Sequence, residues 1–226
     1  MKTKVGQGMK REKMQNKALR LAVLVSGGGT NLQAIIDSER AREQSPFRVS
    51  LVISSTKDAY ALERARRFAI QSEITSPVSV LGSEKAKTAT MEEKRLALSN
   101  AVFELCKKND IDLIVLAGFL TVLTGPIIKA YENRIINMHP ALLPKFGGVG
   151  MWGNHVHEAV LASGEMESGC TVHLVDSGCD TGEILVQKKV PVLQDDTAET
   201  LYKRIAPLEH EAMIEALEML SARLLG

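Results

Sequence analysis

The sequence has few of the features that mark membrane-spanning, secreted or metal-binding proteins. No uninterrupted apolar run approaches the ~18 residues that a bilayer-spanning helix needs. The first residues lack the apolar segment of a secretory signal. Only three cysteines occur, Cys106, Cys170 and Cys179, and neither CxxC spacing nor a Cys/His cluster indicates zinc. We therefore expect a cytoplasmic protein with reduced thiols, no membrane contact and no metal.

The sequence also lacks a surplus of either charge. Its 28 Lys and Arg residues nearly balance 27 Asp and Glu residues, so the formal net charge of +1 gives no case for nucleic-acid binding. Seven of the basic residues fall within residues 1–20, which predicts a solvated basic extension. No repeat or low-complexity linker follows, so residues 21–226 are expected to form a single domain.

Apolar runs and amphipathic helical patterns alternate along residues 21–226. Strand patterns cover 21–25, 47–54, 74–81, 111–117, 135–139, 170–175 and 184–190, although Pro77 weakens the third. Helical patterns cover 30–42, 59–68, 91–108, 154–162 and 198–225, with a bend expected near Pro207. This alternation predicts an α/β fold, in which a mostly parallel twisted sheet carries helices on both faces in a Rossmann-like arrangement. Mixed strand directions are expected toward the C-terminus.

The strand pattern at 135–139 ends in two polar side chains of distinct chemistry. Successive strand residues point to opposite faces, so Asn137 and His139 point the same way. The amide can donate a hydrogen bond to a developing oxyanion, and the imidazole can move a proton near neutral pH. Attack of an amine on an activated carbonyl needs both. A polar strand end followed by a capped loop is the alternative interpretation.

A run of three glycines follows the first strand pattern. The segment 26–31 (SGGGTN) leads directly into a helical pattern, whose unpaired N–H groups and positive dipole end favour an anion. The segment is not a Walker loop, because no Gly-Lys-Ser/Thr follows, and Leu32 replaces the third glycine of a dinucleotide fingerprint. We therefore expect a cradle for a single phosphate. The alternative is a plain turn in which Thr30 caps the helix.

An acidic, glycine-rich loop separates the last two strand patterns. Asp180 lies in this loop, at 176–182, and can approach His139 if the sheet brings the two strand ends together. A carboxylate there would raise the pKa of the imidazole and orient the ring. The alternative is a hairpin turn that uses Asp and Gly for their backbone preferences.

Five motifs together resemble the glycinamide ribonucleotide transformylase family, the folate-dependent phosphoribosylglycinamide formyltransferases of purine synthesis. They read SGGGTNLQAII, LAGFLTVL, INMHPALLPKFGG, GCTVHLVDSGCDTGEIL and LEHEA, within residues 21–219. The resemblance implies a Rossmann-like formyltransferase fold. It also implies transfer of the formyl group of 10-formyltetrahydrofolate, a co-substrate, to the amine of glycinamide ribonucleotide. Partners would be these small molecules, with no metal, nucleic acid or membrane, and a homodimer is left open.

The resemblance also implies roles for particular residues. The catalytic trio would be Asn137, His139 and Asp180. Glu209, in the LEHEA motif, would reach the glycinamide substrate. The residues that would hold the substrate phosphate are Gly28, Gly29, Thr30 and Asn31. The residues that would line the folate pocket are Arg95, Leu120, Thr121, Val122, Leu123 and again Asn137.

The chain departs from the family pattern in two places. The loop after LLP is longer and reads FGGVGMWGNHVHEAV, which leaves open whether His155 or His157 lies near ligand. Thr121 stands where some members carry a basic residue.

Three rival functions are weighed against this one. A methionyl-tRNA formyltransferase needs an RNA-binding domain and a basic surface, whereas the net charge of this chain is only +1. A formyltetrahydrofolate deformylase, which is a hydrolase, carries an additional N-terminal domain that the 20-residue extension is too short to form. A non-catalytic protein that binds a phosphate ligand would leave Asn137 and His139 without a purpose.

Overall fold

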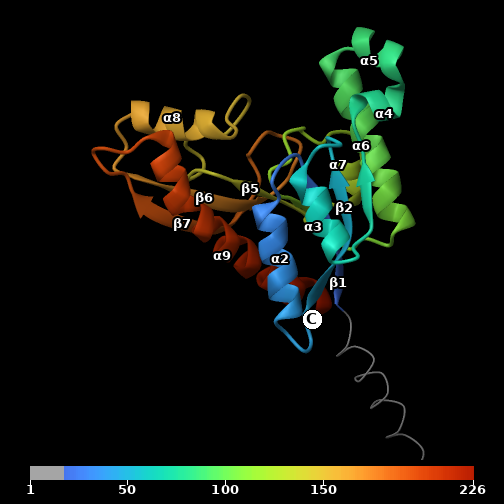
Figure 1. Cartoon of the computed structure of the whole chain (residues 1–226), viewed down its shortest axis with the longest axis horizontal. Coiled ribbons are helices and arrows are strands. Elements are labelled where there is room, and N and C mark those ends of the chain that lie inside the picture. The colour runs from blue at the N-terminus through green and yellow to red at the C-terminus, as the bar shows by residue number, and fades with distance from the viewer. Residues whose placement is uncertain (1–17) are drawn as a thin grey trace, which may run out of the picture.

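The computed structural model describes residues 18–226 (Figure 1). Its elements, in chain order, are β1 (Leu19–Val25), α2 (Thr30–Arg40), β2 (Phe47–Ser54), α3 (Tyr60–Arg67), β3 (Ser72–Ile74), α4 (Pro77–Leu81), α5 (Ser83–Thr88), α6 (Met91–Lys108), β4 (Leu113–Leu116), α7 (Pro126–Ala130), β5 (Ile135–His139), α8 (Asn154–Ala162), β6 (Glu167–Leu174), β7 (Ile184–Pro191) and α9 (Ala198–Leu225). The predicted basic extension, residues 1–20, lies outside the described residues except for its last three, of which Leu19 and Arg20 open β1.

One seven-stranded sheet organises the chain, in the order β3-β2-β1-β4-β5-β6-β7. Neighbouring strands from β3 to β5 pair in parallel, whereas β6 runs antiparallel to both β5 and β7. The predicted mostly parallel sheet with mixed strands toward the C-terminus is confirmed.

Helices cover both faces of the sheet and form two hydrophobic cores. Strand β1 supplies both, since Leu21 and Val23 face a core with α2, α3 and α9, while Ala22 and Leu24 face a core with α6 and α7. Two-sided burial explains why β1 reads as a continuous apolar run rather than an alternating one. Because helices cover both faces of the sheet, the ends of the strands are where the connecting loops reach the surface.

The segment 74–81 was expected to be a strand, and that expectation is wrong. The strand β3 ends at Ile74, and Ser76 then caps α4, with its side chain accepting a hydrogen bond from the backbone N–H of Ser79 at 3.1 Å. Pro77 sits at the first helical position, where its missing N–H costs nothing. The same proline that weakened the strand pattern was therefore a helix-start signal.

The long helix α9 confirms the C-terminal helical pattern. Thr197 caps it, accepting a hydrogen bond from the N–H of Thr200 at 3.2 Å, and Pro207 lies within it. Within residues 18–226, none of the helices combines the length and apolar character needed to cross a membrane.

Candidate active site

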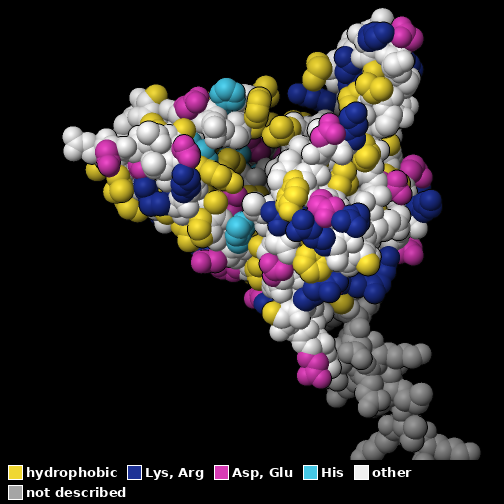
Figure 2. All heavy atoms as spheres, viewed as in Figure 1, with side chains coloured by type: hydrophobic (Ala, Val, Ile, Leu, Met, Phe, Trp, Pro, Cys, Tyr) yellow, Lys and Arg dark blue, Asp and Glu magenta, His cyan; other side chains and the backbone are white. Residues whose placement is uncertain are grey.

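A cavity of about 740 Å³ opens beyond the ends of β1, β4 and β5. The space-filling view shows the molecule hollowed between the part that carries α8 and the part that carries α4 to α6 (Figure 2). The cavity is lined by every residue proposed above for the site, namely Gly28, Gly29, Thr30, Asn31, Arg95, Leu120, Thr121, Val122, Leu123, Asn137, His139, Asp180 and Glu209. Its volume lies in the range that suits small ligands and cofactors.

The glycine loop between β1 and α2 forms one end of the cavity. Gly29, not Thr30, occupies the N-cap position, in the left-handed region at φ +70°, and no side chain among residues 18–226 caps the helix. The alternative in which Thr30 caps the helix is thus wrong. Because no side chain satisfies them, the first N–H groups of α2 are free to bind an anion.

Asn31 and Glu209 form a buried polar pair beside this loop. Asn31 Nδ2 donates to Glu209 Oε2 at 3.0 Å. Burial raises the pKa of Glu209, and the hydrogen bond from Asn31 only partly opposes this. Asn31 Oδ1 is buried without a partner among the described residues. The pair therefore retains hydrogen-bonding capacity toward the cavity.

The register of β5 and β6 sets the centre of the site. Asn137 pairs with His173 across the two strands, and His139 pairs with Thr171, so all four side chains lie on one face. Thr171 Oγ1 accepts from the N–H of Leu143 at 3.1 Å and donates to the carbonyl of Ala141 at 2.6 Å. These bonds hold the Pro-rich loop after His139 against β6.

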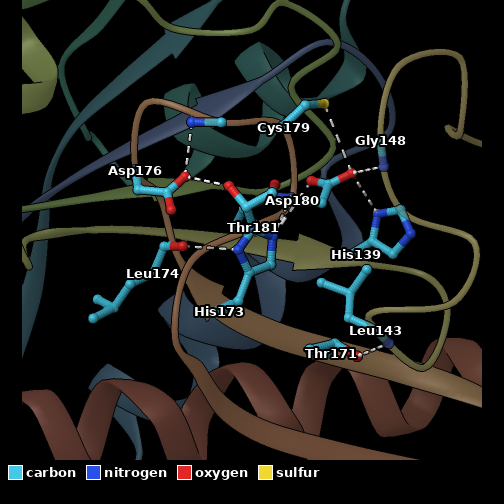
Figure 3. Close-up of polar contacts among 12 residues, drawn as sticks. His139, Leu143, Gly148, Thr171, His173, Leu174, Asp176, Cys179, Asp180 and Thr181 are labelled. Atoms are coloured by element: carbon cyan, nitrogen blue, oxygen red, sulfur yellow. Dashed lines mark hydrogen bonds and ion pairs between the residues drawn. The ribbon is translucent and has the colours of Figure 1, made fainter.

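His139 is held at both ring nitrogens. Its Nε2 donates to the carbonyl of Phe146 at 2.8 Å, and its Nδ1 faces Asp180 Oδ2 at 3.6 Å (Figure 3). The expected rise in the pKa of His139 is wrong in net direction. Burial lowers that pKa and outweighs the raising effects of Asp180 and of the Phe146 carbonyl. Burial therefore favours the neutral form of the ring in the free protein.

Asp180 joins the loop between β6 and β7 to the rest of the site (Figure 3). Its Oδ2 accepts from the N–H of Gly148 at 2.9 Å, and its Oδ1 lies 3.5 Å from His173 Nε2. Burial raises the pKa of Asp180, but His173, Gly148 and His139 together bring it below its ordinary value. The carboxyl is therefore ionised. This loop does connect two antiparallel strands, so the hairpin alternative and the proximity to His139 both hold.

The apolar wall of the cavity is formed by residues 120–123 after β4. Leu123 is buried, whereas Leu120 is 59% exposed at the cavity rim. The N–H of Leu120 donates to Ser26 Oγ at 3.1 Å, which ties this wall to the glycine loop. Arg95, on α6, lines the same cavity. Within residues 18–226, no group of three or more His, Cys, Asp or Glu side chains is placed to hold a metal ion.

Comparison with known proteins places this geometry in a family. The family model described as formyl transferase matches residues 19–217. The chain belongs to the formyl transferase family. A solved formyl transferase of similar structure is glycinamide ribonucleotide transformylase 1 from Symbiobacterium toebii, with a TM-score of 0.79 and 39% identity, covering 91% of this chain and 88% of that one.

Two curated relatives of this chain are longer than the chain itself. The trifunctional purine biosynthetic protein adenosine-3 of Drosophila melanogaster is 40% identical over 208 residues, which are 92% of this chain and 14% of that protein. The chloroplastic phosphoribosylglycinamide formyltransferase of Vigna unguiculata is 38% identical over 201 residues, which are 89% of this chain and 60% of that protein. The chain thus spans a small part of the first relative and three-fifths of the second.

The structure also resolves which histidine of the long formyl transferase loop faces the cavity. His157 is buried, lines the cavity and packs 5.7 Å from the Tyr202 ring, whereas His155 is exposed and packs against Trp152. Burial, and to a lesser extent His139, lower the pKa of His157. Both histidines lie on α8 at near-adjacent positions, so only tertiary packing separates them. Tyr202, also at the cavity, was missed because one aromatic in a long helix reads as core.

Proposed function

We propose that the chain transfers the formyl group of 10-formyltetrahydrofolate to the amine of 5-phosphoribosylglycinamide, giving the N-formyl product and tetrahydrofolate in purine synthesis. One observation carries the proposal. A single cavity joins an anion-binding helix start, a buried amide–imidazole–carboxylate group and an apolar wall. The names of the relatives agree with the ribonucleotide acceptor, with formyl transfer and with purine biosynthesis.

The ribonucleotide fits the glycine-loop end of the cavity. The free N–H groups at the start of α2 would hold the phosphate, with Gly28, Gly29, Thr30 and Asn31 forming the cradle. Glu209, paired with Asn31, would accept hydrogen bonds from donor groups of the glycinamide ribonucleotide.

The folate fits the other end. Residues 120–123 would pack along the pterin ring, and Asn137 would contact the folate near its formyl group. The guanidinium of Arg95 would favour the glutamate carboxylates. Thr121 contributes no charge here, so Arg95 is the cation that this wall offers among the cavity-lining residues.

The geometry of the trio supports the following chemistry. The folate supplies a formyl carbon that is already activated for attack by an amine. Asn137 donates a hydrogen bond to the formyl oxygen as negative charge develops there. The neutral ring of His139 takes up the proton that the attacking amine loses and returns it to the departing folate nitrogen. Asp180 stabilises the imidazolium between these two transfers.

The decisive experiment measures turnover with and without the ribonucleotide. We expect loss of the 10-formyltetrahydrofolate absorbance only when 5-phosphoribosylglycinamide is present. Turnover without it would indicate a deformylase, and binding without turnover would indicate a phosphate-ligand binding protein. Asn137→Ala, His139→Ala and Asp180→Ala should each lower kcat by roughly 100- to 1,000-fold while remaining folded. Near-normal turnover of His139→Ala would contradict its assigned role.

The cytoplasm is the compartment we propose. The three thiols are free, which agrees with a reducing environment. Two plant relatives are described as chloroplastic, so location differs within the family. Expression of the full chain with a C-terminal fluorescent tag tests this, and a membrane or organelle signal would contradict it.

A further inference from the structure

The back of the glycine loop is bonded to α3, on the side away from the cavity. The carbonyl of Gly27 accepts from the N–H of Ala61 at 3.1 Å, and the carbonyl of Gly28 accepts from Arg64 Nε at 2.8 Å. A Cβ placed on Gly29 would lie 2.6 Å from Ala61 Cβ, so the loop rests directly on this helix. Two consecutive carbonyls of the loop are therefore turned toward α3.

Arg64 is itself fixed from three directions. Besides Gly28, its Nη1 donates to Gln33 Oε1 at 2.9 Å, and its guanidinium lies 5.0 Å from the Tyr60 ring centroid. Gln33 is in turn held by donating to Asp37 Oδ1 at 2.8 Å. Because Gln33 lies on α2, the half-buried guanidinium bridges the loop, α2 and α3. The planar guanidinium of an arginine, with donors fixed in two directions, holds its partners in place more tightly than the single ammonium group of a lysine would.

This arrangement has two consequences for an anion in the cavity. A carbonyl dipole that points toward a bound phosphate repels it, and Arg64 keeps the Gly28 carbonyl pointing away. The guanidinium also adds a positive charge beside the loop, of the same sign as the positive end of the α2 dipole. Both effects act on the charged substrate group and not on the formyl group.

We propose that Arg64 is a positioning residue for the phosphate-bearing substrate, acting through the glycine loop without touching the reacting atoms. The proposal rests on the phosphate assignment made under the proposed function. It predicts a specificity effect, because Arg64 favours the phosphorylated ribonucleotide over a riboside that lacks the phosphate.

Neighbouring arginines on α3 offer a matched control. Arg66 is exposed, and its Nε and Nη2 both donate to Glu63 on the same helix, at 2.8 and 2.9 Å. Arg66→Met removes the same charge from the same helix without touching the loop. Comparing it with Arg64→Met separates the loop contact from a general change in surface charge.

The experiment measures steady-state kinetics of the full chain for Arg64→Met, Arg64→Lys and Arg66→Met. For Arg64→Met we expect the KM for the ribonucleotide to rise about 5- to 20-fold. This is less than the roughly 10- to 150-fold effect of losing a direct hydrogen bond from a charged group, because Arg64 acts only through the loop. The folate KM and kcat should stay within about twofold. Arg64→Lys should fall between wild type and Arg64→Met, and Arg66→Met should match wild type.

A second arm measures binding of inorganic phosphate by calorimetry, which needs no turnover. Arg64→Met should bind phosphate more weakly than Arg66→Met does. Equal phosphate affinity in the two variants, or an equal rise in both KM values of Arg64→Met, would overturn the proposal. If wild-type protein binds phosphate through Arg64 but does not formylate the ribonucleotide, the proposed function fails while this inference stands. If Arg64→Met does not fold, Arg64→Lys and Gln33→Met are compared with Arg66→Met instead, by the same kinetics and phosphate binding.

Discussion

Asn137 donates a hydrogen bond from Nδ2 to Nε2 of His173, at 3.1 Å, across the β5–β6 ladder. The role of His173 in this bond follows from its other nitrogen. Nδ1 lies 2.8 Å from the carbonyl of Leu174, and because a carbonyl only accepts, Nδ1 must carry the proton. In the tautomer that carries its single proton on Nδ1, Nε2 is an acceptor, and this bond orients the Asn137 amide with one N–H toward His173.

Replacing His173 should therefore impair catalysis through Asn137. In His173→Phe the ring shape remains, but the acceptor for Asn137 is lost and the amide can rotate. We expect kcat to fall about 10- to 100-fold with little change in either KM, as for a lost transition-state contact. The exposed His155→Phe serves as the matched control. Unchanged kcat in His173→Phe would show that Asn137 needs no such partner.

The buried histidines should make the protein less stable in mild acid. Burial lowers the pKa values of His139, His157 and His210 below their ordinary value of about 6.5. In mild acid the unfolded chain consequently binds more protons than the folded protein does. The free energy of unfolding therefore has its full value above about pH 6.5 and decreases as the pH falls below it. Urea unfolding at several pH values measures this. A free energy of unfolding that rises as the pH is lowered from 7 would contradict it.

The titration of His139 itself can be followed by NMR. We expect its pKa to lie below 6.5, and Asp180→Asn should lower it further, because Asp180 is a group that raises it. The kcat/KM of wild type should decrease as the pH falls through the pKa of His139, because the proposed mechanism needs the neutral ring as proton acceptor. An Asp180→Asn variant with a higher His139 pKa would refute the ion-pair assignment.

The two glycines of the cradle should respond differently to alanine. Gly29→Ala places a side chain at φ +70° and against Ala61, so we expect a loss of at least about 1–2 kcal/mol of stability. A Cβ on Gly28 meets nothing within 4 Å, so Gly28→Ala should fold normally but raise the ribonucleotide KM by occupying cavity space. Thermal unfolding and kinetics distinguish the two. Equal effects on both substrates' KM values would argue against a phosphate cradle.

Glu209 illustrates a cost that the site imposes on stability. Burial raises the pKa of Glu209. The contribution of Glu209 to the free energy of unfolding is therefore fully present when the pH is below its ordinary pKa, and it is lost as the pH rises through the pKa of the folded state. Glu209→Gln keeps an acceptor for Asn31 and removes the buried charge. We expect a higher Tm at pH 7 together with a ribonucleotide KM raised about tenfold. A variant with lower Tm and unchanged KM would place Glu209 in a purely structural role.

The single tryptophan gives a direct probe of the glycine-rich loop. Trp152 is 50% exposed and lines the cavity, near the open backbone turns at Gly150 and Gly153. A tetrahydrofolate analogue should bury the indole and shift its emission to shorter wavelength. Titration of N-acetyltryptophanamide corrects for light absorbed by the pterin. Saturable binding seen by calorimetry without any spectral change would mean that this loop stays away from the ligand.

Strong periodicity made much of the fold predictable. The bounds of 47–54, 91–108 and 154–162 agree with β2, α6 and α8, because each has a clear repeat and a turn or cap at its ends. The helices α5 and α7 were not predicted, since five or six residues carry too little repeat to detect. Local patterns fail where an element is shorter than two helical turns.

The clustering of the proposed site residues around one cavity was predictable, but their electrostatics were not. The spacing of Asn137 and His139 on one strand and the resemblance of five motifs brought together side chains that the structure places around one cavity. The sign of the His139 pKa shift depends on how much protein covers the ring, which no local pattern encodes. The same holds for the Phe146 carbonyl and for His173, whose contacts arise from cross-strand register and loop closure.

The reversed direction of β6 separates what is rigid in this site from what can vary. The ladder between β5 and β6 clamps both ends of the segment 140–166, which contains the glycine-rich loop and α8. Insertions or deletions within that segment would change the residues that line the cavity there. The spacing of Asn137, His139 and His173 would stay the same, because the register of β5 and β6 sets it. If the proposed function is right, grafting this segment between relatives should change substrate binding more than it changes kcat, because the register of β5 and β6 is left intact.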